Sequence, residues 1–154
     1  MSAAAQRKPV SSQAFAPARE LTNTPLAFVS EGPLSVIQHI RHGIAPGAVK
    51  TLADKLGMSK EQFVLTIGLP RSTIKARQTS GKPLSLSESE RMVRVAKVLL
   101  RAIEVLEDAS SASQWIKRPN RSLGGNSPLS LLDTEAGYEL VMDILGRIEH
   151  GVVA

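Results

Sequence analysis

The sequence predicts an all-α protein, in which an N-terminal helix-turn-helix bundle is followed by one long central helix and a small helical domain at the C-terminus. Apolar residues recur at helical spacing along most of the chain. Proline, glycine and short hydroxyl or acidic residues stand between these segments, where helices begin and end. The longest helical pattern extends to about Asp108. These three observations together set the expected fold class.

Size and composition are those of a protein with a core of its own. The chain has 154 residues, an apolar content of 42% and no cysteine, which fits one domain or two small ones and excludes disulfides and thiolate metal sites. No apolar run approaches the roughly 20 residues of a membrane helix, and the N-terminus lacks the apolar segment of a signal peptide. We therefore expect a cytoplasmic protein with no membrane contact.

Charge is divided unevenly between the two ends of the chain. Residues 1–125 carry 18 Lys and Arg against 9 Asp and Glu, whereas residues 126–154 carry only Arg147 against five acids. A basic body attracts polyanions such as nucleic acid, and an acidic end suits a basic protein surface. The alternative is that both are only solvated faces.

The N-terminal residues 1–32 are predicted to form a flexible tail, since their Ala, Ser, Pro and Gln residues show no sustained period. A short helix is expected from Pro33 to Gly43. It carries His39 and His42, which are spaced as two metal ligands could be. Because no third ligand lies nearby, we expect a solvated or partly packed pair, with no metal and no cofactor.

Residues 46–81 show the order of a helix-turn-helix. Pro46 can occupy the first turn of one helix, and Ser59 begins the next with an S-x-x-Q capping box. A tight turn at Gly68 then leads into a brief basic helix over residues 71–78.

The third of these helices has the chemistry of a DNA-reading helix. If Ile74 packs into the core, basic and hydroxyl side chains face outward, where they can contact phosphates and base edges. No acid lies between Glu61 and Glu88, so Arg77 also counts among the unneutralised cations. A basic solvated helix is the alternative. The candidate DNA-binding residues are Arg71, Ser72, Thr73, Lys75, Ala76, Thr79 and Lys82.

The central helix is expected to begin at a capping box formed by Ser87 and Glu90. Its apolar residues extend over so much of its girth that it must be buried from more than one side. Burial between two halves of one chain would satisfy this, and a dimer interface would add to it. We predict a homodimer, which also suits a protein that reads paired DNA half-sites.

A short helix is predicted over residues 113–117, with Trp115 as a core anchor rather than an interface aromatic. Beyond it, Asn126 or Ser127 followed by Pro128 can cap a short helix, and Asp133-Thr134 can cap a second one. In this last helix Ala136, Leu140, Val141, Ile144, Leu145 and Ile148 recur at helical spacing. On spacing alone, the hairpin could be an ordinary helical subdomain.

The C-terminal segment resembles the toxin-binding domain of the ParS/Xre-type antitoxins. The family pattern N-P-x-L-G-G-x-x-P-L-x-L-L-D-T-x-x-G is matched here by Pro119, Leu123, Gly124, Gly125, Pro128, Leu129, Leu131, Leu132, Asp133, Thr134 and Gly137, and the family's L-G-R-I-E-H-G is matched by residues 145–151. The resemblance extends from about Pro33 to the C-terminus. It implies a helix-turn-helix DNA-binding region at 33–108 and a toxin-binding domain at 109–154.

This resemblance implies an antitoxin that binds a RES-domain toxin, an enzyme that consumes NAD, and that represses its own operon by binding operator DNA. The acidic helix 135–149 would lie beside the toxin's cleft, and residues 150–154 would enter or cover it. The expected toxin-binding residues are Arg147, Glu149, His150, Gly151, Val152, Val153 and Ala154. Pro70 departs from the family, because it replaces the hydroxyl cap of the recognition helix and leaves open whether Arg71 or Ser72 reaches a base.

Two other functions are weighed against this one. An enzyme is disfavoured, since the chain has three histidines, no cysteine, no glycine-rich phosphate loop and no paired metal-ligand spacing. A transcriptional repressor that has no toxin partner is the closer alternative. It predicts DNA affinity that falls steeply with salt and no co-purifying protein.

Overall fold

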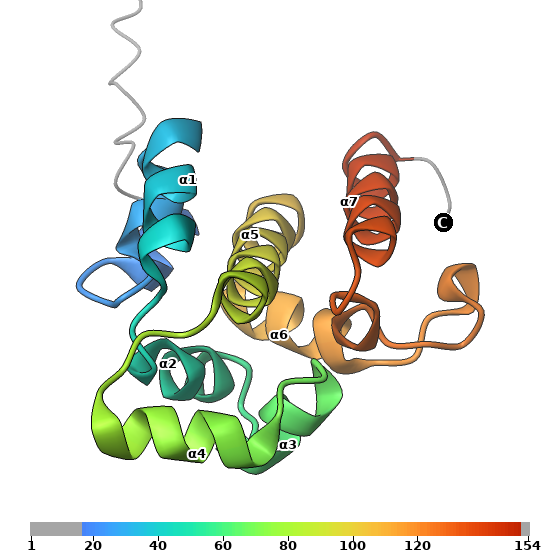
Figure 1. Ribbon diagram of the computed structural model, residues 1–154. Coiled ribbons are helices and arrows are strands. Elements are labelled where there is room, and N and C mark those ends of the chain that lie inside the picture. Colours follow the sequence, from blue (N-terminus) through green and yellow to red (C-terminus); the bar gives the residue numbers. More distant parts are fainter. Residues whose placement is uncertain (1–16, 152–154) are drawn as a thin grey trace, which may run out of the picture.

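The computed structural model describes residues 17–151, and every regular element in that range is helical, which confirms the all-α class. Seven α-helices are joined by short loops and 3₁₀ turns (Figure 1). The helices are α1 (Pro33–His42), α2 (Gly47–Lys55), α3 (Lys60–Thr66), α4 (Arg71–Ser80), α5 (Leu86–Leu106), α6 (Ala109–Lys117) and α7 (Glu135–Glu149). The 3₁₀ helices are η1 (Pro17–Leu21), η2 (Ala27–Ser30), η3 (Arg121–Leu123) and η4 (Leu129–Leu131). None of the helices in this part of the chain could span a membrane.

Helix α5 lies at the centre, with α1 on one side, α7 on the other and α2 to α4 below it (Figure 1). It contacts α1, α2, α6 and α7 as well as η1 and η2. Its buried apolar residues are Met92, Val93, Val95, Ala96, Val98, Leu99, Ala102 and Ile103. Packing within one chain therefore accounts for the broad apolar girth that the sequence shows, without a second copy.

Both ends of α5 differ from the prediction by about two residues. Ser85, not Ser87, is the N-cap, and its side chain accepts a hydrogen bond from the backbone N–H of Glu88 at 3.2 Å. The sequence offers two overlapping S-x-x-E boxes, and the first is used. At the other end Glu107 takes a left-handed φ of 57°, so that Asp108 caps α6 instead of ending α5.

The segment over residues 17–32 is folded, so the predicted flexible tail over 1–32 is wrong for this part. Leu21, Leu26 and Phe28 are buried, and η1 and η2 pack against α5. The two 3₁₀ helices η1 and η2 show neither the 3.6-residue hydrophobic period of an α-helix nor the two-residue period of a strand. The sequence pattern therefore did not predict them. Residues 1–16 lie outside the described range.

The His39 ring stacks on Phe28, with ring centroids 4.1 Å apart and planes 3° from parallel. Its Nδ1 atom lies 2.8 Å from the Ser35 carbonyl oxygen. His39 is exposed to solvent, but its stacked ring joins α1 to η2, and His42 is exposed on the last turn of α1.

The helix-turn-helix region folds as its caps predict. Ser59 accepts a hydrogen bond from the Gln62 N–H at 3.1 Å and begins α3. Gly68, at a φ of 71°, makes the turn between α3 and α4, where a residue with a side chain would be strained. Phe63 and Ile74 are buried and join these two helices to the core.

A partly buried ion pair joins the end of α4 to the start of α5. Arg77 contacts the Glu88 carboxylate at 3.0 Å and donates to the Pro83 carbonyl at 2.7 Å. The Glu88 side chain is only 7% exposed. Arg77 therefore does not belong to the free basic surface that the sequence analysis assigned it to.

Replacing Glu88 with Ala is expected to destabilise the protein by about 2 kcal/mol, because the partly buried Arg77 guanidinium would lose its counter-charge. Urea unfolding followed by circular dichroism measures the loss. Asp54→Ala is the control, since Asp54 and Lys50 form a pair that is mostly exposed to solvent and contributes at most about 1 kcal/mol. Equal effects of the two substitutions would contradict the structural role given to the partly buried pair.

The C-terminal elements form a compact unit on the flank of α5. Thr134 caps α7 by accepting from the Gly137 N–H at 3.0 Å, as predicted. From α5, Arg94 donates to the Leu132 carbonyl at 2.8 Å and to the Asp133 carbonyl at 3.1 Å. The loop before α7 is thereby fixed to the central helix.

Two apolar residues of this unit differ from expectation in their environment. Leu140, which the periodicity placed on the apolar face of the last helix, is 44% exposed. Trp115 is half-buried and packs at the edge of the core instead of at its centre. The helix that carries it is longer than predicted, because α6 begins at Ala109.

Candidate functional site

Helix α4 exposes the face that the sequence predicts to read DNA. Ile74 is 2% exposed and anchors the helix. Among the predicted residues, Arg71, Ser72, Lys75, Ala76, Thr79 and Lys82 are exposed, and Thr73 is half-buried. Because successive residues of a helix turn by about 100°, Ser72, Ala76 and Thr79 lie opposite Ile74. The hydroxyl groups and the small Ala76 thus form the outermost surface of α4.

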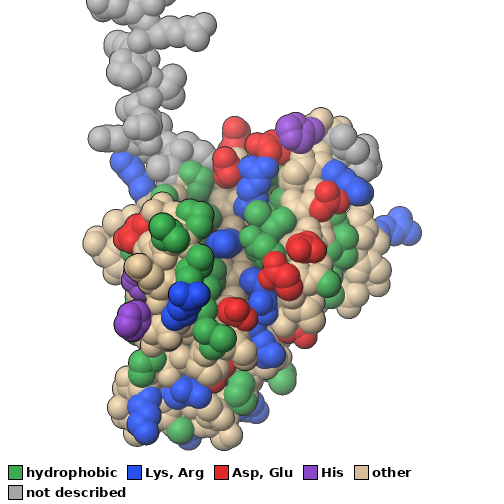
Figure 2. Space-filling view, turned by 45° about the horizontal axis from the view of Figure 1, so that its top comes forward, with side chains coloured by type: hydrophobic (Ala, Val, Ile, Leu, Met, Phe, Trp, Pro, Cys, Tyr) green, Lys and Arg blue, Asp and Glu red, His purple; other side chains and the backbone are tan. Residues whose placement is uncertain are grey.

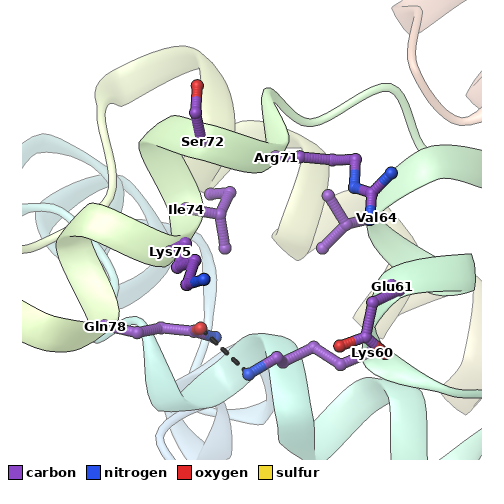
Figure 3. A pocket seen from close by; sticks show the side chains of 8 residues that line it. All are labelled: Lys60, Glu61, Val64, Arg71, Ser72, Ile74, Lys75 and Gln78. Carbon is purple, nitrogen blue, oxygen red and sulfur yellow. Dashed lines mark hydrogen bonds between the residues drawn. The ribbon is translucent and has the colours of Figure 1, made fainter.

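A hollow of about 350 Å³ separates α4 from α3 (Figure 3). Arg71 and Lys75 line it from α4, and Lys60 and Glu61 line it from α3. Ser72 points away from α3, whereas the Arg71 side chain extends towards it (Figure 3). Arg71 and Ser72, either of which could reach a base, thus point in different directions.

Lys60 is a cation of this surface that sequence reasoning missed. Its Nζ donates to the Gln78 Oε1 at 3.0 Å across the hollow (Figure 3). Lys60 is the first residue of α3, and the capping box had drawn attention to Ser59 alone. In a helix-turn-helix the start of α3 lies close to α4. This geometry could have indicated Lys60 as a residue of the same surface.

The second candidate surface is the outer face of α7. Val141, Ile144 and Leu145 point into the core, and the exposed face carries Glu135, Glu139, Asp143 and Glu149 with the single cation Arg147. Arg147 pairs with Asp143 at 3.0 Å. Most of the Asp and Glu side chains visible in Figure 2 lie over the part of the molecule that carries α5 and α7, where Lys and Arg side chains lie among them.

The carboxylate of Glu149, predicted to contact a toxin, is held within the chain. Arg101 of α5 donates to both of its oxygens, to Oε1 at 3.3 Å and to Oε2 at closer range. The hydrogen bond from Arg101 lowers the pKa of Glu149 below its ordinary value. The carboxylate is therefore ionised at neutral pH and already has a partner 48 residues away in the sequence.

Two described residues follow Glu149. His150 and Gly151 are exposed, and Gly151 has a left-handed φ of 72°. The other predicted toxin-binding residues, Val152, Val153 and Ala154, lie outside the described range.

Two family models match the chain. Residues 35–97 match the antitoxin Xre-like helix-turn-helix domain, and residues 101–151 match the antitoxin Xre/MbcA/ParS C-terminal toxin-binding domain. Both of these ranges end or begin within α5, so that the central helix contributes to each.

Whole-chain relatives agree with the family models. An antitoxin Xre of Photorhabdus laumondii is 34% identical over 146 residues, which are 91% of this chain and 98% of the relative. An antitoxin Xre of Yersinia enterocolitica is 30% identical over 76% of this chain and 80% of its own length. A protein of a Sphingobium species named "Prs ADP-ribosylating antitoxin" is 26% identical, over 83% of this chain and 86% of its own. With a helix-turn-helix and a toxin-binding domain that both match, the chain belongs to the Xre family of antitoxins.

Proposed function

We propose that this antitoxin neutralises a RES-domain toxin, an NAD-consuming enzyme, by covering the toxin's active-site cleft with its C-terminal domain. The observation that carries the proposal is the match of residues 101–151 to a toxin-binding domain whose last residues form an exposed end. In the proposal, α7 lies beside the cleft and residues 150–154 block nucleotide access. Neutralisation is then steric and needs no cofactor.

The acidic face of α7 and the name of one relative support the proposal that the toxin is an NAD-consuming enzyme. The acidic face of α7 suits the basic surroundings that an enzyme needs around the phosphates of NAD. The Sphingobium relative carries ADP-ribosylation in its name, and ADP-ribose transfer uses NAD as the donor. Both lines favour a toxin with a nucleotide cleft.

The second arm of the proposal is operator binding through α4, with repression of the antitoxin's own operon. Lys60, Arg71, Lys75 and Lys82 supply cations for phosphate contacts, and Ser72 and Thr79 supply hydroxyl donors. The proposal includes a homodimer, because helix-turn-helix proteins read two half-sites about one helical turn apart. Light scattering of the free protein measures its mass and tests this part.

Co-expression with the protein encoded beside this gene, which the proposal takes to be the RES-domain toxin, tests the neutralisation arm. Growth arrest by the toxin alone, relieved when the antitoxin is present, supports the proposal. Unrelieved arrest, with no complex on co-purification, would leave only the reading as a repressor without a toxin.

Arg71→Ala and Lys75→Ala are each expected to weaken binding to the operon's promoter fragment by about tenfold, with a shallower salt dependence, because each removes one cation from the phosphate surface. Fluorescence anisotropy at several salt concentrations measures both quantities. Lys50→Ala is the matched control, since Lys50 is exposed on α2 and pairs with Asp54. If neither α4 variant binds more weakly than the control, α4 is not the recognition helix.

A further inference from the structure

The exposed end of α7 needs a fixed direction if it is to enter a cleft. Most of α7 is held by Val141, Ile144 and Leu145, whose side chains are buried. All three precede the last turn of the helix. In that turn only Ile148 is partly buried against the core, and Glu149, His150 and Gly151 are exposed.

An arginine of the central helix also holds this last turn. Arg101 of α5 holds the Glu149 carboxylate through two nitrogens, and one of these nitrogens also contacts Glu104 at 2.9 Å. The Arg101 side chain is 23% exposed and that of Glu149 is 39% exposed. A forked guanidinium that meets both oxygens of a carboxylate fixes direction as well as distance.

We infer that Arg101 is a positioning residue for neutralisation, which acts through Glu149 to aim the His150–Gly151 end of α7 at the toxin. The inference rests on the proposed function and assigns a new role to two residues. Glu149 anchors the end of α7 within the chain, and Arg101 balances its charge. Arg101 is required for neutralisation although it lies on the central helix and not on α7. The pair joins the first residue of the toxin-binding match to its last turn.

The geometry distinguishes aiming from general stability. Arg101 lies near the C-terminal end of α5, whereas α4 precedes the N-terminal end of α5 in the chain, and the buried residues of α5 do not include Arg101. Without the ion pair the last turn of α7 samples several directions. Only the molecules whose α7 end has the binding direction can then bind the toxin, so the apparent affinity falls in proportion to their fraction.

Charge reversal and its compensation test the inference. NAD hydrolysis by the cognate toxin of the proposed function is titrated with wild type, with Arg101→Glu and with the double variant Arg101→Glu, Glu149→Arg. The single variant is expected to need about tenfold more protein for half-inhibition, and the double variant is expected to recover most of that loss. The control variant Lys50→Glu breaks the exposed Lys50–Asp54 ion pair, and it is expected to inhibit the toxin as wild type does.

A second measurement reports direction without the toxin. The native chain has no cysteine, so a nitroxide on His150→Cys is a unique probe of the α7 end. Its spectrum is expected to narrow on adding Arg101→Ala, while promoter binding and the far-ultraviolet circular dichroism stay as they are. An unchanged spectrum, full inhibition by Arg101→Glu or no recovery in the double variant would each overturn the role of Arg101. Failure of wild type to inhibit would overturn the proposed function itself.

Discussion

Deleting residues 147–154 will abolish neutralisation while promoter affinity stays within about twofold of wild type, because the two surfaces are distant. The deletion removes Arg147, the anchored Glu149, the exposed His150 and Gly151, and residues 152–154. It spares Val141, Ile144 and Leu145, which hold α7 against α5. Loss of the group that fills a partner's pocket typically costs 2 kcal/mol or more, so we expect at least about thirtyfold weaker inhibition of NAD hydrolysis.

The opposite variant completes this experiment. Arg71→Ala is expected to lose promoter affinity and to inhibit the toxin fully, since α4 lies at the other end of the molecule from the exposed end of α7 (Figure 1). Full inhibition by the truncated protein would rule out the blocking mechanism. Parallel loss of both activities in the truncated protein would show that the deletion acts on the fold instead.

Replacing Gly137 with Ala will destabilise the C-terminal unit by at least about 2 kcal/mol. A Cβ atom at this position would lie 1.8 Å from the Leu131 carbonyl oxygen and 2.8 Å from the Leu131 carbonyl carbon. Both are backbone atoms of η4, which cannot rotate away as a flexible side chain could. The start of α7 would therefore have to separate from η4, and the thermal midpoint of unfolding is expected to fall by several degrees.

Gly146 provides the matched substitution in the same helix. A Cβ there meets nothing within 4 Å, so Gly146→Ala should raise stability by about 0.5 to 1 kcal/mol through helix propensity alone. Calorimetry of the two variants beside wild type measures opposite shifts of the midpoint. Shifts of the same sign would contradict the close packing of α7 on η4.

Local rules made most of the fold predictable. The caps at Ser59 and Thr134 and the turn at Gly68 depend on residues within four positions of one another, and each is found where the sequence indicates it. Where two local rules competed, as at Ser85 and Ser87, the pattern could not choose. In the structure Ser85 is the N-cap, and the Glu88 carboxylate of the same box pairs with Arg77 of α4, a contact that no local pattern contains.

The candidate site was less predictable because its decisive contacts are long-range. Arg101 and Glu149 are 48 positions apart, and no spacing links residues on two helices whose packing is unknown. The exposure of Leu140 has the same origin, since periodicity does not show where the neighbouring helices end. The folded segment over residues 17–32 was missed because its burial depends on α5.

The central position of α5 affects how proteolysis would inactivate the protein. Its buried residues belong to the one hydrophobic core that both halves of the described chain share. The helix-turn-helix match ends within this helix and the toxin-binding match begins within it. One proteolytic cut in this helix would unfold both halves together. Under the proposed function, release of the toxin and derepression of the operon would then follow the same time course, so that renewed synthesis begins as soon as protection ends.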